Sequence, residues 1–343
     1  MDSQLSSSSK ECNIKQRRGE RSSAGRTLLH NAIAYAIAIA IVWYAARGVS
    51  WPQIAGALGH ATLWLFIGVS AAGFLCWFIG ETLLYSRLFT FFHGPTRSFE
   101  LLPTMSAMYF LQIVNSWVAS GALLLFLHSR KRVPWMTAGC TLLFQAYVDA
   151  VTLATLAIFS ILLLPASVLR PALWYAVGVV VGGGIIGWFF LAWGARLSPR
   201  NPLRWIHDRP SMVTFRLARP SQFVKLAAIR SVLCVVAGLM LYGQFVSFHL
   251  PVPLIETLAL SPIIVAIGNS PFSPGGIGTT QLVLIFGFAA FAGKGDLFAI
   301  SLAITVFNLL VRIPMGLAMR EPLMETEAIA SEPPKLAATF RAG

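Results

Sequence analysis

Long apolar runs recur along most of the chain, and short polar or basic segments separate them. About 20 consecutive apolar residues are needed to cross a bilayer as a helix. By this criterion the pattern predicts membrane-crossing helices at residues 28–46, 62–84, 136–164, 171–194, 224–248 and 297–318. Two further apolar stretches, 101–127 and 255–293, differ because polar and small residues interrupt them.

The basic segments decide how these two interrupted stretches are interpreted. Lys and Arg accumulate in cytoplasmic loops, which places the basic N-terminal tail inside. The cluster at 130–132 also falls inside, but only if 101–127 enters the membrane and returns as a hairpin. The same treatment of 255–293 leaves the last span ending inside. We therefore predict an all-α polytopic membrane protein with six full spans and two re-entrant helical hairpins, and the alternative is eight simple spans.

The hairpin interpretation gives the chain an internal symmetry. Each half, about 27–166 and 171–318, reads as span, span, hairpin, span. Three crossings per half is an odd number, so the second half is inverted relative to the first, as in many transporters. We expect one membrane domain at 27–320, flanked by a disordered basic tail at 1–26 and a polar tail at 321–343. Both termini would be cytoplasmic, in a bacterial-type cytoplasmic membrane.

Composition agrees with a membrane protein. Of the 343 residues, 56% are hydrophobic and 11% charged, whereas soluble domains carry about 25% charged residues. The net charge of +13 is explained by basic residues at the ends of apolar runs, so no nucleic-acid partner is expected. The chain lacks metal-binding cysteine spacings and hydrolase or nucleotide-binding motifs. We expect no enzyme activity, metal or cofactor.

The strongest local signal is the segment from Asn269 to Gln281, which holds two prolines and three glycines and cannot continue a helix. Backbone groups freed at membrane depth must be buried in protein or line a wet cavity. The alternative is a tight turn without a ligand. Candidate binding residues are those of this break together with two from the first interrupted stretch: Asn115, Ser116, Asn269, Ser273, Gly275, Gly276, Gly278, Thr279, Thr280 and Gln281.

Four ionisable residues lie inside predicted spans: Glu81, Asp149, Arg230 and Arg312. Such groups usually face a bundle interior or a cavity. Asp149 lies deepest, with Gln145 one turn earlier on the same face. It would either bind a cation or proton, or pair with Arg230 or Arg312. Glu81 and Arg230 lie nearer span ends, where long side chains more often extend to the interface.

At its Pro-Gly-Gly-Ile-Gly break the chain resembles the flippase-like membrane region of lysylphosphatidylglycerol synthases, over roughly residues 28–318. Pro274, Gly275, Gly276 and Gly278 match the family pattern, whereas Thr280 and Gln281 stand where the family has a charged pair. In the first break Asn115 and Ser116 match, and Leu124 stands near a glutamate position; Gln145 likewise replaces a glutamate. The resemblance implies translocation of a lipid headgroup without the synthase step.

We therefore predict a flippase or transporter of lipids or lipid-linked headgroups. Its partners would be membrane lipids, either an anionic phospholipid or a polyprenyl (isoprenoid) lipid. Two alternatives stay open: an ion-coupled exporter of a small solute, and a non-transporting membrane partner of a lipid-modifying or glycosyl-transferring enzyme.

Overall fold

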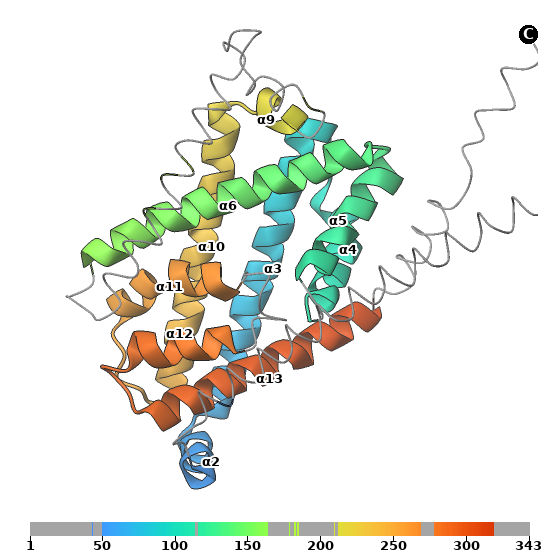
Figure 1. Cartoon of the computed structure of the whole chain (residues 1–343). Coiled ribbons are helices and arrows are strands. Elements are labelled where there is room, and N and C mark those ends of the chain that lie inside the picture. The colour runs from blue at the N-terminus through green and yellow to red at the C-terminus, as the bar shows by residue number, and fades with distance from the viewer. Residues whose placement is uncertain are drawn as a thin grey trace, which may run out of the picture.

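The computed structural model describes residues 43, 50–113, 116–163, 178, 182, 184, 209, 212–268 and 278–318, and for 116, 117, 161–163, 317 and 318 the backbone alone. All regular structure in this part of the chain is helical (Figure 1), which confirms the predicted all-α class. The predicted spans 28–46 and 171–194 lie outside the described residues apart from isolated positions, as do both tails.

Four helices are long and apolar enough to cross a membrane. They are α3 (Leu63–His93), α6 (Trp135–Leu163), α10 (Pro220–Ser247) and α13 (Lys294–Ala318), and each coincides with a span expected from hydropathy. Large apolar side chains on them stay uncovered by protein, among them Trp64 at 87% exposure and Val232 at 62%. Because a surface of this kind is stable only against lipid, the protein is an integral membrane protein.

The two helices α3 and α10 run antiparallel and side by side through the molecule, and α6 and α13 cross them obliquely (Figure 1). Their direction is fixed at one end, where the Thr62 amide before α3 donates to the Ser247 carbonyl at the end of α10 (2.8 Å). Glycines allow the two backbones to approach closely: a Cβ on Gly243 would lie 2.6 Å from a Val69 methyl carbon. Small residues at the contact are a common device for packing helices within membranes.

The first interrupted stretch forms two short helices, α4 (Ser98–Leu111) and α5 (Ser116–Lys131), which pack against each other. Their outer ends lie together, because the Lys131 ammonium at the end of α5 donates to the Pro95 carbonyl before α4 (2.7 Å). Lys131 also lies 3.9 Å from the Glu100 carboxylate in the first turn of α4. The chain therefore leaves this helix pair at the level at which it entered.

The second interrupted stretch also forms a pair, α11 (Leu254–Gly268) and α12 (Thr279–Phe288). The Phe288 ring at the end of α12 lies 4.7 Å from the ring of Phe245 near the end of α10. The carbonyl of Phe245 also accepts from the Leu250 amide, just before α11 begins (3.0 Å). The outer ends of α11 and α12 therefore lie near the C-terminal end of α10. The outer ends of α4 and α5 lie near the C-terminal end of α3. Because α3 and α10 are antiparallel, the two pairs have their outer ends at opposite ends of these two helices.

Two short helices lie between the predicted spans, where the sequence analysis predicted no helix: α2 (Trp51–His60) and α9 (Val213–Leu217). Hydropathy missed them because neither is long enough to cross a membrane.

The helix contacts of the two halves correspond to each other. Helix α2 packs on α13 and α9 on α6; α4 packs on α13 and α11 on α6; α5 packs on α6 and α12 on α13. Each of these contacts thus has a counterpart in the other half.

The apolar core is divided into two clusters. One gathers side chains around Phe89, Leu101 and Phe144, from α3, α4 and α6, and the other surrounds Phe245 and Phe288. The polar side chains of the bundle interior gather between these two clusters.

Candidate functional site

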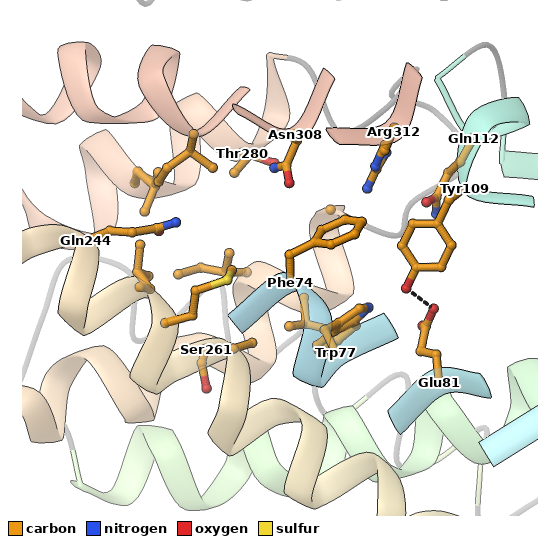
Figure 2. Close-up of a pocket in the computed structure, with 18 residues that line it drawn as sticks. Phe74, Trp77, Glu81, Tyr109, Gln112, Gln244, Ser261, Thr280, Asn308 and Arg312 are labelled. Carbon is orange, nitrogen blue, oxygen red and sulfur yellow. Dashed lines mark hydrogen bonds between the residues drawn. The ribbon is translucent and has the colours of Figure 1, made fainter. Parts of the chain in front are cut away.

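A cavity of about 200 Å³ lies in this middle region, where the inner ends of both helix pairs meet α3, α10 and α13 (Figure 2). The first pair contributes Gln112, just after α4, and the second contributes Gly268 and Thr280, on either side of its break. The polar lining comprises Glu81, Tyr109, Gln112, Gln244, Ser261, Thr280, Asn308 and Arg312. Phe74 and Trp77 on α3 supply an aromatic wall, so the lining is amphipathic.

Behind this wall Arg230 on α10 joins three helices. Its side chain is 3% exposed, with Nη1 3.2 Å from the Glu81 carboxylate on α3 and Nε 3.2 Å from the Asp149 carboxylate on α6. The guanidinium also lies over the Trp77 ring, 5.3 Å from its centroid. A guanidinium is tolerated at this depth because two carboxylates compensate its charge.

Both carboxylate oxygens of Glu81 already have a protein partner. One carboxylate oxygen pairs with Arg230, and the other accepts from the Tyr109 hydroxyl of α4 at 2.5 Å (Figure 2). Asp149 is held in turn by Gln145, whose amide donates to it at 2.9 Å. The acidic side of the site is therefore already neutralised or hydrogen-bonded by protein groups.

Arg312 on α13 differs from Arg230. Its guanidinium lies 5.6 Å from the Tyr109 ring centroid, but within the described part of the chain no carboxylate pairs with it. Its Nε atom is buried and has no hydrogen-bond partner there. Figure 2 shows the side chain extending from α13 into the cavity. Among the described residues that line it, the cavity thus carries one cationic side chain, and the Nε donor of this side chain has no hydrogen-bond partner.

The other polar side chains fall into two sets. Gln244 donates to Ser70 at 2.9 Å, and the Ser261 hydroxyl bonds to the Cys234 carbonyl at 3.0 Å, so these belong to the protein's own network. In contrast, Gln112, Thr280 and Asn308 have no side-chain hydrogen bond to any described residue. The unsatisfied donors therefore gather with Arg312 on the side formed by α13, the end of α4 and the start of α12.

The start of α12 is built by a glycine and a glutamine. Gly278 has φ +91°, a left-handed conformation that side chains other than glycine rarely adopt. Its amide donates to the Gln281 side-chain oxygen at 2.6 Å, and the Gln281 amide donates to Thr305 on α13 at 2.8 Å. Gln281, 3% exposed, therefore shapes the break and fixes it to α13, while the adjacent Thr280 faces the cavity.

Comparison with protein families identifies the chain. Residues 31–316 match the model of the lysylphosphatidylglycerol synthase TM region. The chain belongs to this family. Regions of this family are thought to be flippase-like, and the match covers the stretch in which the sequence resemblance was seen. Comparison with curated proteins and with solved structures gave no match.

The structure places the predicted site residues of this family member unevenly. Thr280 and Arg312 line the cavity, and Asp149, Gln145 and Arg230 form the network behind it. Gly278 and Thr279 stand at the start of α12, and Ser116 begins α5 with its side chain undescribed. Five predicted residues lie outside the described part of the chain: Asn115, Asn269, Ser273, Gly275 and Gly276.

The expectation that Glu81 and Arg230 extend to the membrane interface is wrong. Both turn inward, because each supplies the charge that the other needs inside the bundle. Of the alternatives for Asp149, the structure shows the ion pair with Arg230 rather than with Arg312. The sequence analysis also missed Tyr109, Gln112 and Asn308, because no proline-glycine break or cluster of charges marks them in the sequence.

Proposed function

We propose that the protein translocates lipid headgroups across the membrane and that the cavity is the headgroup site. One observation supports this most directly: the inner ends of both interrupted helix pairs converge on one cavity, whose lining carries polar and charged side chains beside apolar ones. Its volume of about 200 Å³ is below the roughly 300–1,000 Å³ of pockets for drug-sized ligands. It suits a headgroup whose acyl chains remain in the bilayer.

On this proposal α4–α5 and α11–α12 are re-entrant hairpins that enter the membrane from opposite faces. The close outer ends of each pair and their position at opposite ends of the α3–α10 couple support this arrangement. So does the correspondence of helix contacts between the halves. Broken helices at matching places of an inverted repeat typically surround a transporter's binding site, and rocking of one half against the other gives alternating access.

The same proposal includes what we expect about catalysis, binding partners and membrane orientation. The chain would act without catalysing a reaction, its partners would be membrane lipids, and both termini would be cytoplasmic in a bacterial-type membrane. The family match supports the flippase-like class.

The test is transport by the purified protein in proteoliposomes. A fluorescent phospholipid reports translocation when dithionite quenches only the outer leaflet. Asn308→Trp fills the cavity from α13, and Val306→Trp adds the same side chain to an outward-facing position of that helix, 47% exposed. We expect the first variant to abolish translocation and the second to retain it.

Two results would contradict the proposal. Equal translocation by both variants would show that the lipid headgroup does not pass through the cavity. A wild-type protein that moves a small polar solute into vesicles, but no lipid, would instead favour the solute exporter. Circular dichroism and size-exclusion chromatography of both variants would exclude misfolding as the cause of a loss.

A further inference from the structure

Resting on the proposed function, we infer that the cavity binds the phosphate of its lipid and that Arg312 is the phosphate anchor. The substrate class is then a phosphate-bearing lipid rather than a neutral glycolipid or diglyceride. The observation behind this inference is the asymmetry of the site: its carboxylate is occupied by protein groups, whereas its arginine is not.

Charge is the first step. A buried guanidinium without an anionic partner is costly in a low-dielectric environment, so such groups are normally paired. The structure gives Arg230 two carboxylates, whereas among the described residues no carboxylate lies within ion-pair distance of Arg312, which has the Tyr109 ring beside it. The negative charge of Glu81 is already shared between Arg230 and the Tyr109 hydroxyl, and Glu81 makes no ion pair with Arg312. We therefore expect a bound ligand to supply the anion that pairs with the Arg312 guanidinium.

The hydrogen-bond donors around the cavity indicate which kind of anion would bind. Arg312 offers up to five N–H donors in a planar fork, and Asn308 and Gln112 each add an amide N–H₂ group. The Thr280 hydroxyl lies in the first turn of α12, whose positive end also favours an anion. A group with several acceptor oxygens matches this set of donors, and Arg pairs with phosphate through two parallel N–H···O bonds.

The position of Arg312 beside apolar side chains indicates whether the phosphate belongs to a lipid or is free in solution. Asn308 and Arg312 are one turn apart on α13, and Figure 2 shows them on the same side of the cavity, facing the aromatic wall of Phe74 and Trp77. A phosphate at Arg312 would thus have apolar surface beside it. A lipid phosphate brings glycerol and acyl carbons to that surface, whereas free inorganic phosphate leaves it bare.

Binding tests the inference without requiring transport. The full-length protein in a non-ionic detergent is titrated with dihexanoyl phosphatidylglycerol, with dihexanoylglycerol, which lacks the phosphate, and with inorganic phosphate. Isothermal titration calorimetry measures the affinity, and ligand-dependent thermal stabilisation provides an independent readout. We expect the wild-type protein to bind the phosphatidylglycerol at least about tenfold more tightly than either of the other two.

Arg312→Gln should weaken phosphatidylglycerol binding about tenfold or more, the usual effect of losing a charged hydrogen bond. Arg97→Gln removes the same charge from an exposed position before α4 and should leave binding unchanged. Thr280→Val, nearly isosteric, is the second variant in case Arg312→Gln does not fold, and we expect a smaller loss.

Each contrary result has a defined meaning. Equal affinity for dihexanoylglycerol would overturn the phosphate site, and equal affinity for inorganic phosphate would overturn the lipid source. Unchanged binding by a folded Arg312→Gln would remove Arg312 as the anchor. Phosphate-dependent binding without translocation in proteoliposomes would overturn the proposed function and leave the binding site standing, whereas translocation without phosphate-dependent binding would do the reverse.

Discussion

Arg230 and Glu81 stand 149 residues apart in the chain, yet their side chains meet at 3.2 Å between α10 and α3, the central antiparallel helices. Each belongs to a different half of the chain. The pair connects the halves directly behind the aromatic wall of the cavity, and Asp149 brings α6 into the same network. Loss of this network should therefore lower the stability of the protein and change the geometry of the cavity wall.

The first prediction concerns this network. Arg230→Met removes the cation and leaves two carboxylates facing each other in the bundle. Breaking a buried ion pair on one side typically costs about 3–5 kcal/mol, so we expect markedly lower thermal stability in detergent. The triple variant Arg230→Met, Glu81→Gln, Asp149→Asn removes all three charges and should recover much of the loss. Wild-type stability of the single variant would show that Arg230 is not needed to compensate the acids.

Hydropathy was sufficient to predict the four long helices of the described residues and the positions of the two interrupted stretches, because it is a property of segments. Hydropathy could not predict the Arg230–Glu81 contact. Position along a span says nothing about which face of a helix a residue occupies, and distance from the span end suggested the interface. Pairing depends on how α3 packs against α10, which the glycine contacts between them determine.

The candidate site divides along a similar line. Gly278 and Thr280 could be found because a break of proline and glycine inside an apolar stretch is visible in the sequence. Asn308 and Gln112 could not, since each is a single polar residue in or beside an apolar helix. They become part of a site only when α13 and α4 pack together around the break.

The second prediction tests the close approach of α3 and α10. Gly243→Val would place a methyl against the stiff, β-branched side chain of Val69. Overpacking of this kind typically costs about 1–3 kcal/mol, and we expect a lower melting temperature. Gly68→Val, on an exposed face of α3 with nothing within 4 Å of its added Cβ, is the control.

A compensating change sharpens this test. Val69→Ala in the Gly243→Val background should restore part of the stability, because it removes the methyls that clash. If the double variant is as unstable as the sum of the two single variants, the two positions do not contact each other.

The third prediction concerns the direction of the helix pairs. In a cysteine-free protein, single cysteines replace the exposed residues Arg97 and Arg130, at the outer ends of α4 and α5, and Pro251 and Ala290, beside the outer ends of α11 and α12. An impermeant maleimide should label the first two from the cytoplasmic side and the last two from the opposite side. Labelling of Arg97→Cys and Arg130→Cys from different sides would mean that the first stretch crosses the membrane once, as in the eight-span alternative.

The fourth prediction separates two neighbouring residues at the break. Gln281→Ala leaves the buried Gly278 amide and the Thr305 hydroxyl without their side-chain partner. An unpaired buried polar group costs about 1–3 kcal/mol, so we expect lower stability and, through displacement of the start of α12, slower translocation. Thr280→Val breaks no described hydrogen bond and should therefore leave the melting temperature unchanged while weakening lipid binding. Both readouts come from the same purified protein: thermal denaturation followed by fluorescence, and lipid titration. If Gln281→Ala keeps full stability but loses binding, the glutamine acts on the ligand directly, and the structural role assigned to it here would have to pass to another residue of the break.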